Sequence, residues 1–140
     1  TGSVMLNVQV VPIEFIPTVF PYVEEFIDNA LQFSRGEYTA DEARVYLVRG
    51  EWQLIAAVDE QNVIHGCAVI QYHNRPRARV AFVVAIGGKL ITSKDTFQQF
   101  ADILRAHGAT CIEGAVREAI ARLWRRYGFS EKYRIVEFEL

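Results

Sequence analysis

Residues 80–129 read VAFVVAIGGKLITSKDTFQQFADILRAHGATCIEGAVREAIARLWRRYGF. Two apolar runs, at residues 80–86 and 110–116, predict strands, and the amphipathic segment after each run predicts a helix. Two strands joined through a helix imply a parallel pair with a right-handed crossover, because parallel neighbours need a long connection. A ligand is therefore expected at the carboxyl ends of these strands, beside a helix N-terminus.

The chain before this stretch predicts a first strand, two helices and further strands. Residues 7–14 form the expected first strand, and hydrophobic residues recur at helical spacing over residues 19–31. Thr39 and Glu42 form a capping-box pattern that opens a second helix, which is expected to end at Gly50. Three antiparallel strands then follow, at residues 52–58, 63–72 and 78–86.

A last strand at residues 133–140 completes the predicted order β-α-α-β-β-β-α-β-α-β. We therefore predict a single α/β (α+β) domain over residues 5–140, built on a mixed central sheet. Residues 1–4 begin with Thr-Gly-Ser ahead of Met5, and we interpret them as a cloning remnant.

The composition is that of a globular protein. Hydrophobic residues make up 51% of the chain and charged residues 23%, which is ordinary for a folded domain. No apolar run approaches the roughly 20 residues of a membrane helix, and the N-terminus lacks the basic start of a signal peptide. We expect a cytoplasmic protein without a membrane partner.

The net charge of -2 conceals an asymmetry between the two halves of the chain. Residues 1–60 hold ten acidic and three basic side chains, whereas residues 61–140 hold seven acidic and twelve basic ones. A basic half around the crossover suits a phosphate-bearing ligand, and the alternative is a chance excess of solvated arginines. The absence of a dense Lys/Arg run among aromatic residues weighs against a nucleic-acid surface.

Two cysteines, Cys67 and Cys111, fall on predicted strands. If the strand at residues 78–86 lies between theirs, their backbones are about 9 to 10 Å apart, too far for a disulfide. We interpret both as small buried hydrophobic residues. His65 lies two residues from Cys67 and so shares its face, but no Cys/His spacing matches a zinc site, and no metal is expected.

This order of elements, with a last helix that runs into Tyr127-Gly128-Phe129, resembles the GNAT superfamily of acyl-CoA-dependent N-acetyltransferases over nearly the whole chain. Within that superfamily, the chain looks most similar to uncharacterised GNAT-like proteins of tailed bacteriophages. The residues that carry this similarity are the run GEWQL at 50–54, Gly66, Gly87, Gly88, Gly114, Arg117, Arg122, Leu123, Gly128 and Phe129.

The resemblance implies acetyl-CoA as the cofactor. In the family, the fourth and fifth strands splay apart, so that backbone groups of the fourth bond the pantetheine arm, and the next loop and helix N-terminus bind the pyrophosphate. Carried over to this sequence, the strands would diverge after Val84, and the arm would face Val84, Ala85 and Ile86. The phosphates would meet Gly87, Gly88, Lys89, Thr92, Ser93 and Lys94.

The phosphate loop departs from the family pattern. The usual motif is Arg or Gln, two residues, Gly, one residue, then Gly or Ala. Lys89 takes the basic position here, whereas Thr92 and Lys94 replace the two small residues. Because glycine lets the backbone approach a phosphate closely, side-chain contacts from Lys89, Ser93 and Lys94 would have to compensate.

The catalytic positions depart from the pattern too. Trp124 replaces the tyrosine that often protonates the leaving thiolate, and Arg117 replaces the asparagine seven residues earlier. We interpret both as contacts to substrate or phosphate, and Tyr127 as a packing residue. The predicted fourth strand holds no acidic residue, so Glu113 on the fifth is the candidate general base. The alternative pairs Glu113 with an arginine such as Arg117.

Two functions follow from the resemblance. The first is an N-acetyltransferase that acetylates an amine of a small molecule or a protein, for which positioning supplies much of the rate. The second is a GNAT-fold domain without catalysis, acting as a binding or virion-associated phage protein in the host cytoplasm or the virion. Fold alone does not choose between them. A homodimer paired through the last strand is a further expectation, because sheet edges invite pairing.

Overall fold

The computed structural model of the protein describes residues 5–32, 38–115, 118–132 and 136–140, so the predicted remnant at residues 1–4 and the candidate Arg117 lie outside it. The described chain builds one mixed sheet, in which the strands lie in the order of the sequence. The first four strands pair antiparallel and the last pair is parallel. The strands are β1 (Asn7–Val11), β2 (Gln53–Val58), β3 (Ile64–Arg75), β4 (Ala78–Gly88) and β5 (Cys111–Gly114).

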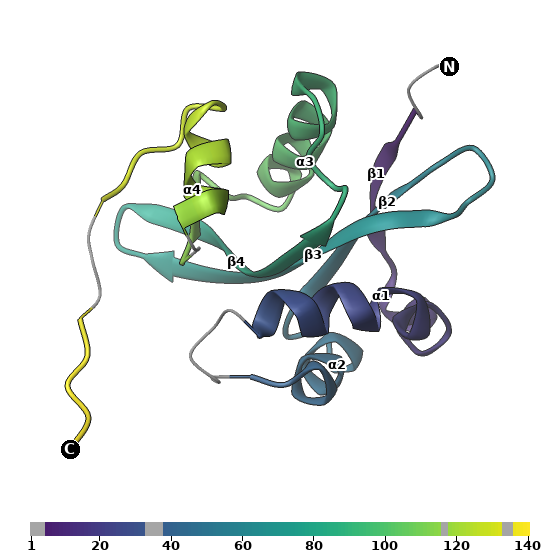
Figure 1. Ribbon diagram of the computed structural model, residues 1–140, viewed down its shortest axis with the longest axis horizontal. Coiled ribbons are helices and arrows are strands. Elements are labelled where there is room, and N and C mark those ends of the chain that lie inside the picture. The colour runs from purple at the N-terminus through teal and green to yellow at the C-terminus, as the bar shows by residue number, and fades with distance from the viewer. Residues whose placement is uncertain (1–4, 33–37, 116–117, 133–135) are drawn as a thin grey trace.

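Helices cover both faces of this sheet (Figure 1). One face carries α1 (Ile16–Leu31) and α2 (Ala40–Val48), and the other carries α3 (Lys94–Ala106) and α4 (Glu118–Arg125). A short 3-10 turn, η1 (Ile13–Phe15), leads into α1. Each face has its own hydrophobic cluster, so the sheet is sandwiched between two cores.

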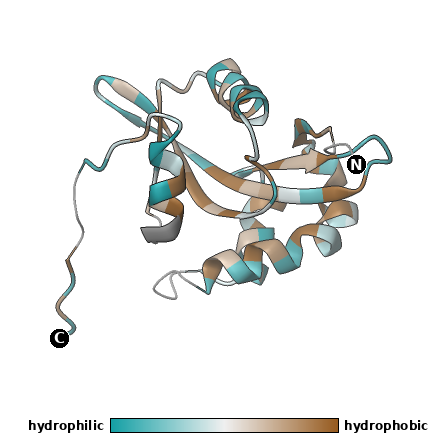
Figure 2. Cartoon of the chain, turned by 45° about the horizontal axis from the view of Figure 1, so that its top comes forward, coloured by the Kyte–Doolittle hydropathy of each residue, from teal (hydrophilic) through white to brown (hydrophobic). Residues whose placement is uncertain are grey.

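Helix α1 shows how the sequence positions these layers. Its buried residues are spaced by three or four positions, which places them on the side of the helix that faces the sheet. The opposite side is hydrophilic (Figure 2). These buried residues are Ile16, Phe20, Val23, Ile27 and Leu31.

Capping residues fix the start of α2 as the sequence predicts. Thr39 Oγ1 accepts a hydrogen bond from the Glu42 amide at 3.1 Å, and Glu42 Oε1 accepts one from the Thr39 amide at 3.1 Å. This reciprocal pair satisfies two backbone donors at the end of the helix. Gly50, the predicted stop, lies just past α2 with φ +77°.

Both cysteines are unpaired, and β4 separates their strands. Cys67 is buried, and burial raises the pKa of its thiol to about 12. Its thiol is therefore protonated at neutral pH and behaves as a small hydrophobic group.

The predicted last strand is wrong for the described part of the tail. Residues 136–140 have no regular structure, and residues 133–135 lie outside the description. Three large hydrophobic side chains of this tail are exposed, by 91% at Val136, 86% at Phe138 and 113% at Leu140. The strand was predicted because the tail is rich in aromatic and branched residues, but residue type alone does not supply the neighbouring strand that a place in a sheet requires.

Candidate active site

The paired part of β4 and β5 is short, and β4 extends beyond it. The two strands pair only from Val80 with Cys111 to Val83 with Gly114. β5 ends at Gly114, whereas β4 continues to Gly88 with β3 on its other side. Beyond Val83, the edge of β4 that faces β5 therefore has no strand partner among the described residues. The divergence predicted after Val84 begins one residue earlier.

A β-bulge lies at this point of divergence. Ile70 of β3 pairs with Val83 and Val69 pairs with Ala85, which leaves Val84 as the extra residue. A bulge disrupts the local ladder and bends the strand, and bulges are frequent beside active sites. The side chains of Val84 and Ile86 pack against the two opposite cores. Backbone groups of residues 84–86 are thus the polar atoms that this edge offers to a ligand.

The two glycines at the end of β4 are required by packing. A Cβ on Gly87 would lie 2.6 Å from the carbonyl oxygen of Phe26 in α1. Gly88 has φ +68°, and a Cβ there would lie 2.5 Å from the carbonyl oxygen of His65. The Lys89 amide donates to that same oxygen at 2.8 Å. Close approach to α1 and β3 explains both glycines without a phosphate.

The N-terminus of α3 is capped by its own side chains. Thr96 Oγ1 accepts from the amides of Thr92 at 2.9 Å and Ser93 at 3.1 Å, and Ser93 Oγ accepts from the Thr96 amide at 3.2 Å. Two of the predicted phosphate contacts, Thr92 and Ser93, therefore have backbone donors that are already bonded. The side chains of Lys89 and Lys94 are exposed beside them and carry the positive charge of this loop.

Asp95 adds a negative charge in the same turn. Its carboxylate accepts a hydrogen bond from Gln99 Nε2 at 2.8 Å. An acidic residue in the first turn stabilises a helix but repels a bound anion. The negative charge of Asp95 therefore cancels part of the positive charge of the two lysines and weakens their attraction for a phosphate.

Trp124 lies over the last residue of β5. Its side chain is only 5% exposed, and a Cβ on Gly114 would lie 3.0 Å from the nearest ring atom. The same ring packs against Phe129, with centroids 4.9 Å apart. Trp124 thus sits where β4 and β5 part, and an arm entering between the strands would run beside its indole.

A second aromatic contact joins α3 to the end of α4. The ring of Phe97 stacks on Tyr127 with centroids 5.1 Å apart and meets Phe129 edge-on at 5.9 Å. Stacked and edge-to-face pairs of this kind stabilise packing. Tyr127 therefore makes a packing contact, which agrees with its interpretation from the sequence as a packing residue.

Glu113 forms an ion pair across β4. Its two carboxylate oxygens accept from Nη1 and Nη2 of Arg75 at 2.7 and 2.9 Å. The side chain of Glu113 is 22% exposed and that of Arg75 is 45% exposed. Its partner among the described residues is therefore an arginine, as the alternative predicts, but it is Arg75, and Arg117 lies outside the description. The register explains the contact, because Phe82 of β4 lies between Glu113 and Gln71 of β3.

His73 lies on the same face of the sheet as this ion pair. Residues two apart on a strand share a face, so His73 stands beside Arg75. Its ring lies 6.4 Å from that of Phe82, the direct neighbour of Glu113. A polar patch of an imidazole, a guanidinium and a carboxylate therefore borders the strands where they begin to part. The predicted strand at residues 63–72 stops one residue before His73, whereas β3 continues to Arg75, and so the sequence did not connect His73 to Glu113.

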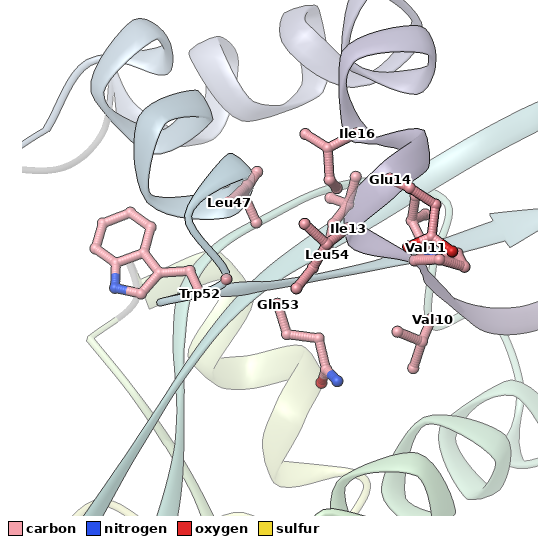
Figure 3. Close-up of a pocket in the computed structure, with 11 residues that line it drawn as sticks. Val10, Val11, Ile13, Glu14, Ile16, Leu47, Trp52, Gln53 and Leu54 are labelled. Carbon is pink, nitrogen blue, oxygen red and sulfur yellow. The ribbon is translucent and has the colours of Figure 1, made fainter.

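Two surface hollows lie on the side of the sheet that α1 and α2 cover. One, of about 320 Å³, is a mainly apolar recess lined by residues of β1, η1, α2 and β2, among them Val10, Leu47 and Trp52 (Figure 3). β3 and β4 separate it from β5. The other, of about 410 Å³, lies between α1 and α2 and is lined by the carboxylates Glu24, Glu25, Asp28 and Asp41.

Residues 5–32, 38–115, 118–132 and 136–140 contain neither a candidate metal cluster nor a candidate membrane span. There, no three His, Cys, Asp or Glu side chains gather closely enough to hold a metal ion. Of the helices in those ranges, none combines the length and hydrophobicity needed to span a membrane.

Comparisons with solved structures place this fold among acetyltransferases. A predicted acetyltransferase from Clostridium acetobutylicum, solved with acetyl-CoA, is 12% identical with a TM-score of 0.62, and the match covers 96% of each chain. A ribosomal-protein-alanine N-acetyltransferase from Brucella melitensis is 12% identical with a TM-score of 0.68, covering 97% of this chain and 99% of that one.

A third similar structure is an aminoglycoside acetyltransferase from an uncultured soil metagenome, solved with sisomicin. It is 10% identical with a TM-score of 0.69, and the match covers 96% of this chain and 95% of that one. No family model and no curated protein matches the sequence. The chain thus has the mixed five-stranded α/β fold of GNAT-type acetyltransferases.

Proposed function

We propose that the protein is an N-acetyltransferase that uses acetyl-CoA to acetylate a primary amine. The observation that carries this proposal is the early end of the β4–β5 pairing at Val83 and Gly114, with the bulged Val84 directly beyond it. An unpaired strand edge offers amides and carbonyls to an extended, amide-containing arm, as a second strand would. The acetyltransferase fold adds support, since a similar structure was solved with acetyl-CoA.

The residues around this edge suit the parts of such a cofactor. The backbone of residues 84–86 would bond the arm, and the side chains of Lys89 and Lys94 would balance the phosphate charge beside the start of α3. When bound, acetyl-CoA would supply the acetyl group as a thioester. Trp124 would shield the reacting end from water, because its buried ring lies over Gly114.

Proton transfer would fall to the polar patch on the other side of these strands. Glu113 would accept the proton that the amine nitrogen loses as its bond to the acetyl carbon forms. Arg75 holds that carboxylate in one orientation through two hydrogen bonds. The sulfur would leave as a thiolate and take its proton from solvent only after its release from the site, because the indole of Trp124 is no acid.

Isothermal titration of the full chain with acetyl-CoA tests the proposal. We expect binding in the micromolar range and a loss of affinity of about fivefold in Lys89→Ala, because one exposed cation near a phosphate contributes about 1 kcal/mol. Lys132→Ala removes an exposed lysine from the segment after α4 and serves as the control. No heat at millimolar acetyl-CoA would refute the proposal and favour a binding domain without catalysis.

Turnover is the second readout. Release of free thiol from acetyl-CoA, followed in the presence of a panel of small primary amines and lysine peptides, identifies the acceptor class. Binding without release for any member of the panel would separate cofactor binding from catalysis.

A further inference from the structure

The apolar recess bounded by β1, η1, α2 and β2 has no part in the proposed reaction. Its volume of about 320 Å³ lies in the range of small-molecule pockets. Leu47, Ile13 and Leu54 converge on it from α2, η1 and β2 (Figure 3). Two strands, β3 and β4, lie between it and β5. A ligand in this recess would therefore not reach the edge of β4 that we assign to acetyl-CoA.

The lining of the recess offers mainly apolar surface. Leu47 and Leu54 are buried beneath it, each with 1% exposure. The one amide side chain of the lining, that of Gln53, already has partners. Its nitrogen bonds to Nε2 of His107 at 3.0 Å, and its oxygen accepts from the Tyr72 hydroxyl at 2.7 Å. An apolar ligand group can therefore cover this surface without leaving that amide unpaired.

A single charge borders the recess. Of the described residues that line it, only Glu14 is charged. Glu14 is exposed and takes part in no hydrogen bond or ion pair within the described part of the chain. Arg49 and Glu51, which flank Gly50, have opposite charges and offset one another. All the lining elements belong to residues 1–60, which hold ten acidic and three basic side chains, so the surrounding field also favours a cation.

We propose that this recess binds a small amphiphilic cation, a molecule with an apolar body and a protonated amine at one end. The apolar body would cover Leu47 and Leu54, and the ammonium would lie against the carboxylate of Glu14. Figure 3 shows Glu14 and Trp52 at opposite ends of the recess, so the molecule would lie along it with its charged end at η1. This site is a second one, separate from the acceptor of the proposed acetylation.

Amide NMR spectra of the full chain test the site. The probe is N,N-dimethylphenethylamine, because its tertiary amine is protonated at neutral pH and cannot be acetylated. We expect it to shift the amide signals of Leu47, Gly50 and Leu54, with a dissociation constant of about 1 mM or lower. Phenethyl alcohol has the same ring without the charge, and it should bind at least about fivefold more weakly.

Two variants separate the charge from the apolar surface. Glu14→Gln should weaken binding of the amine about fivefold and leave that of the alcohol unchanged. Ile13→Lys places a cation in the recess at a side chain that is 53% exposed, and it should weaken binding of the amine about tenfold or more. Val63→Lys is the matched control, because Val63 is 54% exposed between β2 and β3, outside the recess. It should change the affinity less than about twofold.

Three results would overturn the proposal. Unchanged spectra at millimolar amine would mean that the recess stays empty. Shifts centred on Gly114 would place the amine at the β4–β5 edge. Equal affinity for the amine and the alcohol, in the unaltered protein, would remove the role of Glu14. Because none of these measurements uses acetyl-CoA, the recess can fail its test while the acetyltransferase proposal stands, and the reverse.

Discussion

The guanidinium of Arg75 holds both carboxylate oxygens of Glu113, at 2.7 and 2.9 Å, across the strand that lies between them. The two residues are 38 positions apart in sequence. A carboxylate held in this way has a fixed orientation but shares both oxygens with a cation. Variants of the two residues should therefore differ in their effect on catalysis while having similar effects on stability.

Glu113→Gln should abolish proton acceptance and lower kcat/KM by about a hundredfold or more. Arg75→Gln keeps the carboxylate and should lower kcat/KM by less than about tenfold. Both variants should lose at most about 1 kcal/mol of unfolding free energy, because the arginine is largely exposed to solvent. Thiol-release kinetics and urea unfolding measure the two effects. Equal losses of kcat/KM would assign Glu113 a purely structural role.

Gly88→Ala should be far more destabilising than Gly128→Ala. Both glycines have positive φ, +68° at Gly88 and +101° at Gly128. An alanine at either position is therefore strained and lowers the unfolding free energy. A Cβ at Gly88 would also collide with the His65 carbonyl, whereas at Gly128 nothing lies within 4 Å. We expect about 1 kcal/mol at Gly128 and about 3 kcal/mol or more at Gly88. Urea unfolding measures both free energies, and equal losses would contradict the packing account of Gly88 at the end of β4.

Gly114→Ala and Trp124→Phe should be coupled. A Cβ on Gly114 would lie 3.0 and 3.2 Å from two atoms of the six-membered ring of Trp124, and phenylalanine would leave part of that space open. Gly114→Ala alone should cost about 1 to 2 kcal/mol through overpacking. The double variant should cost less than the sum of the single variants by at least about 0.5 kcal/mol. Chemical unfolding of the unmodified protein, the two single variants and the double variant gives the four free energies of this double-mutant cycle. Additive losses of unfolding free energy would mean that the indole does not contact residue 114.

Asp59 should make stability depend on acid pH. The hydrogen bond from His65, at 2.8 Å, and those from the Val63 and Gln61 amides lower the pKa of Asp59 below its ordinary value of 3.8. A lowered pKa in the folded state stabilises the protein above pH 3.8, and this contribution is lost as pH falls through the folded-state value.

Thermal unfolding of the protein and of Asp59→Asn across this range measures the contribution. The Tm of Asp59→Asn should be lower at pH 7, and the difference should shrink below pH 3.8. A difference in Tm that is constant with pH would mean that Asp59 contributes through its shape and not through its charge.

Local signals in the sequence predicted most of the elements. The Thr39–Glu42 capping box and Gly50 mark α2, and the hydrophobic spacing marks α1. The antiparallel order of β2, β3 and β4 and the parallel step to β5 also follow from the sequence, because consecutive strands pair with their neighbours and the helical crossover requires a parallel step. These features depend on residues that are close together in the chain.

The site was less predictable, because its contacts depend on register. Nothing local to Glu113 points to Arg75, and the role of Thr96 in occupying the Thr92 and Ser93 amides appears only when the turn before α3 is seen. The tail misled the prediction for another reason: its residue types are those of a strand, but residue type alone supplies no partner. The resemblance to phage proteins stays a prediction.

The order of the sheet also bears on how the protein is made. Strands β1 to β4 are neighbours in both sequence and space, so a nascent chain leaving the ribosome can assemble four-fifths of the sheet before β5 is synthesised. β5, which carries Glu113, and α4, which carries Trp124, are added last. During that interval the whole length of β4 is an open edge, and this is the stage at which we expect the chain to be most prone to aggregate.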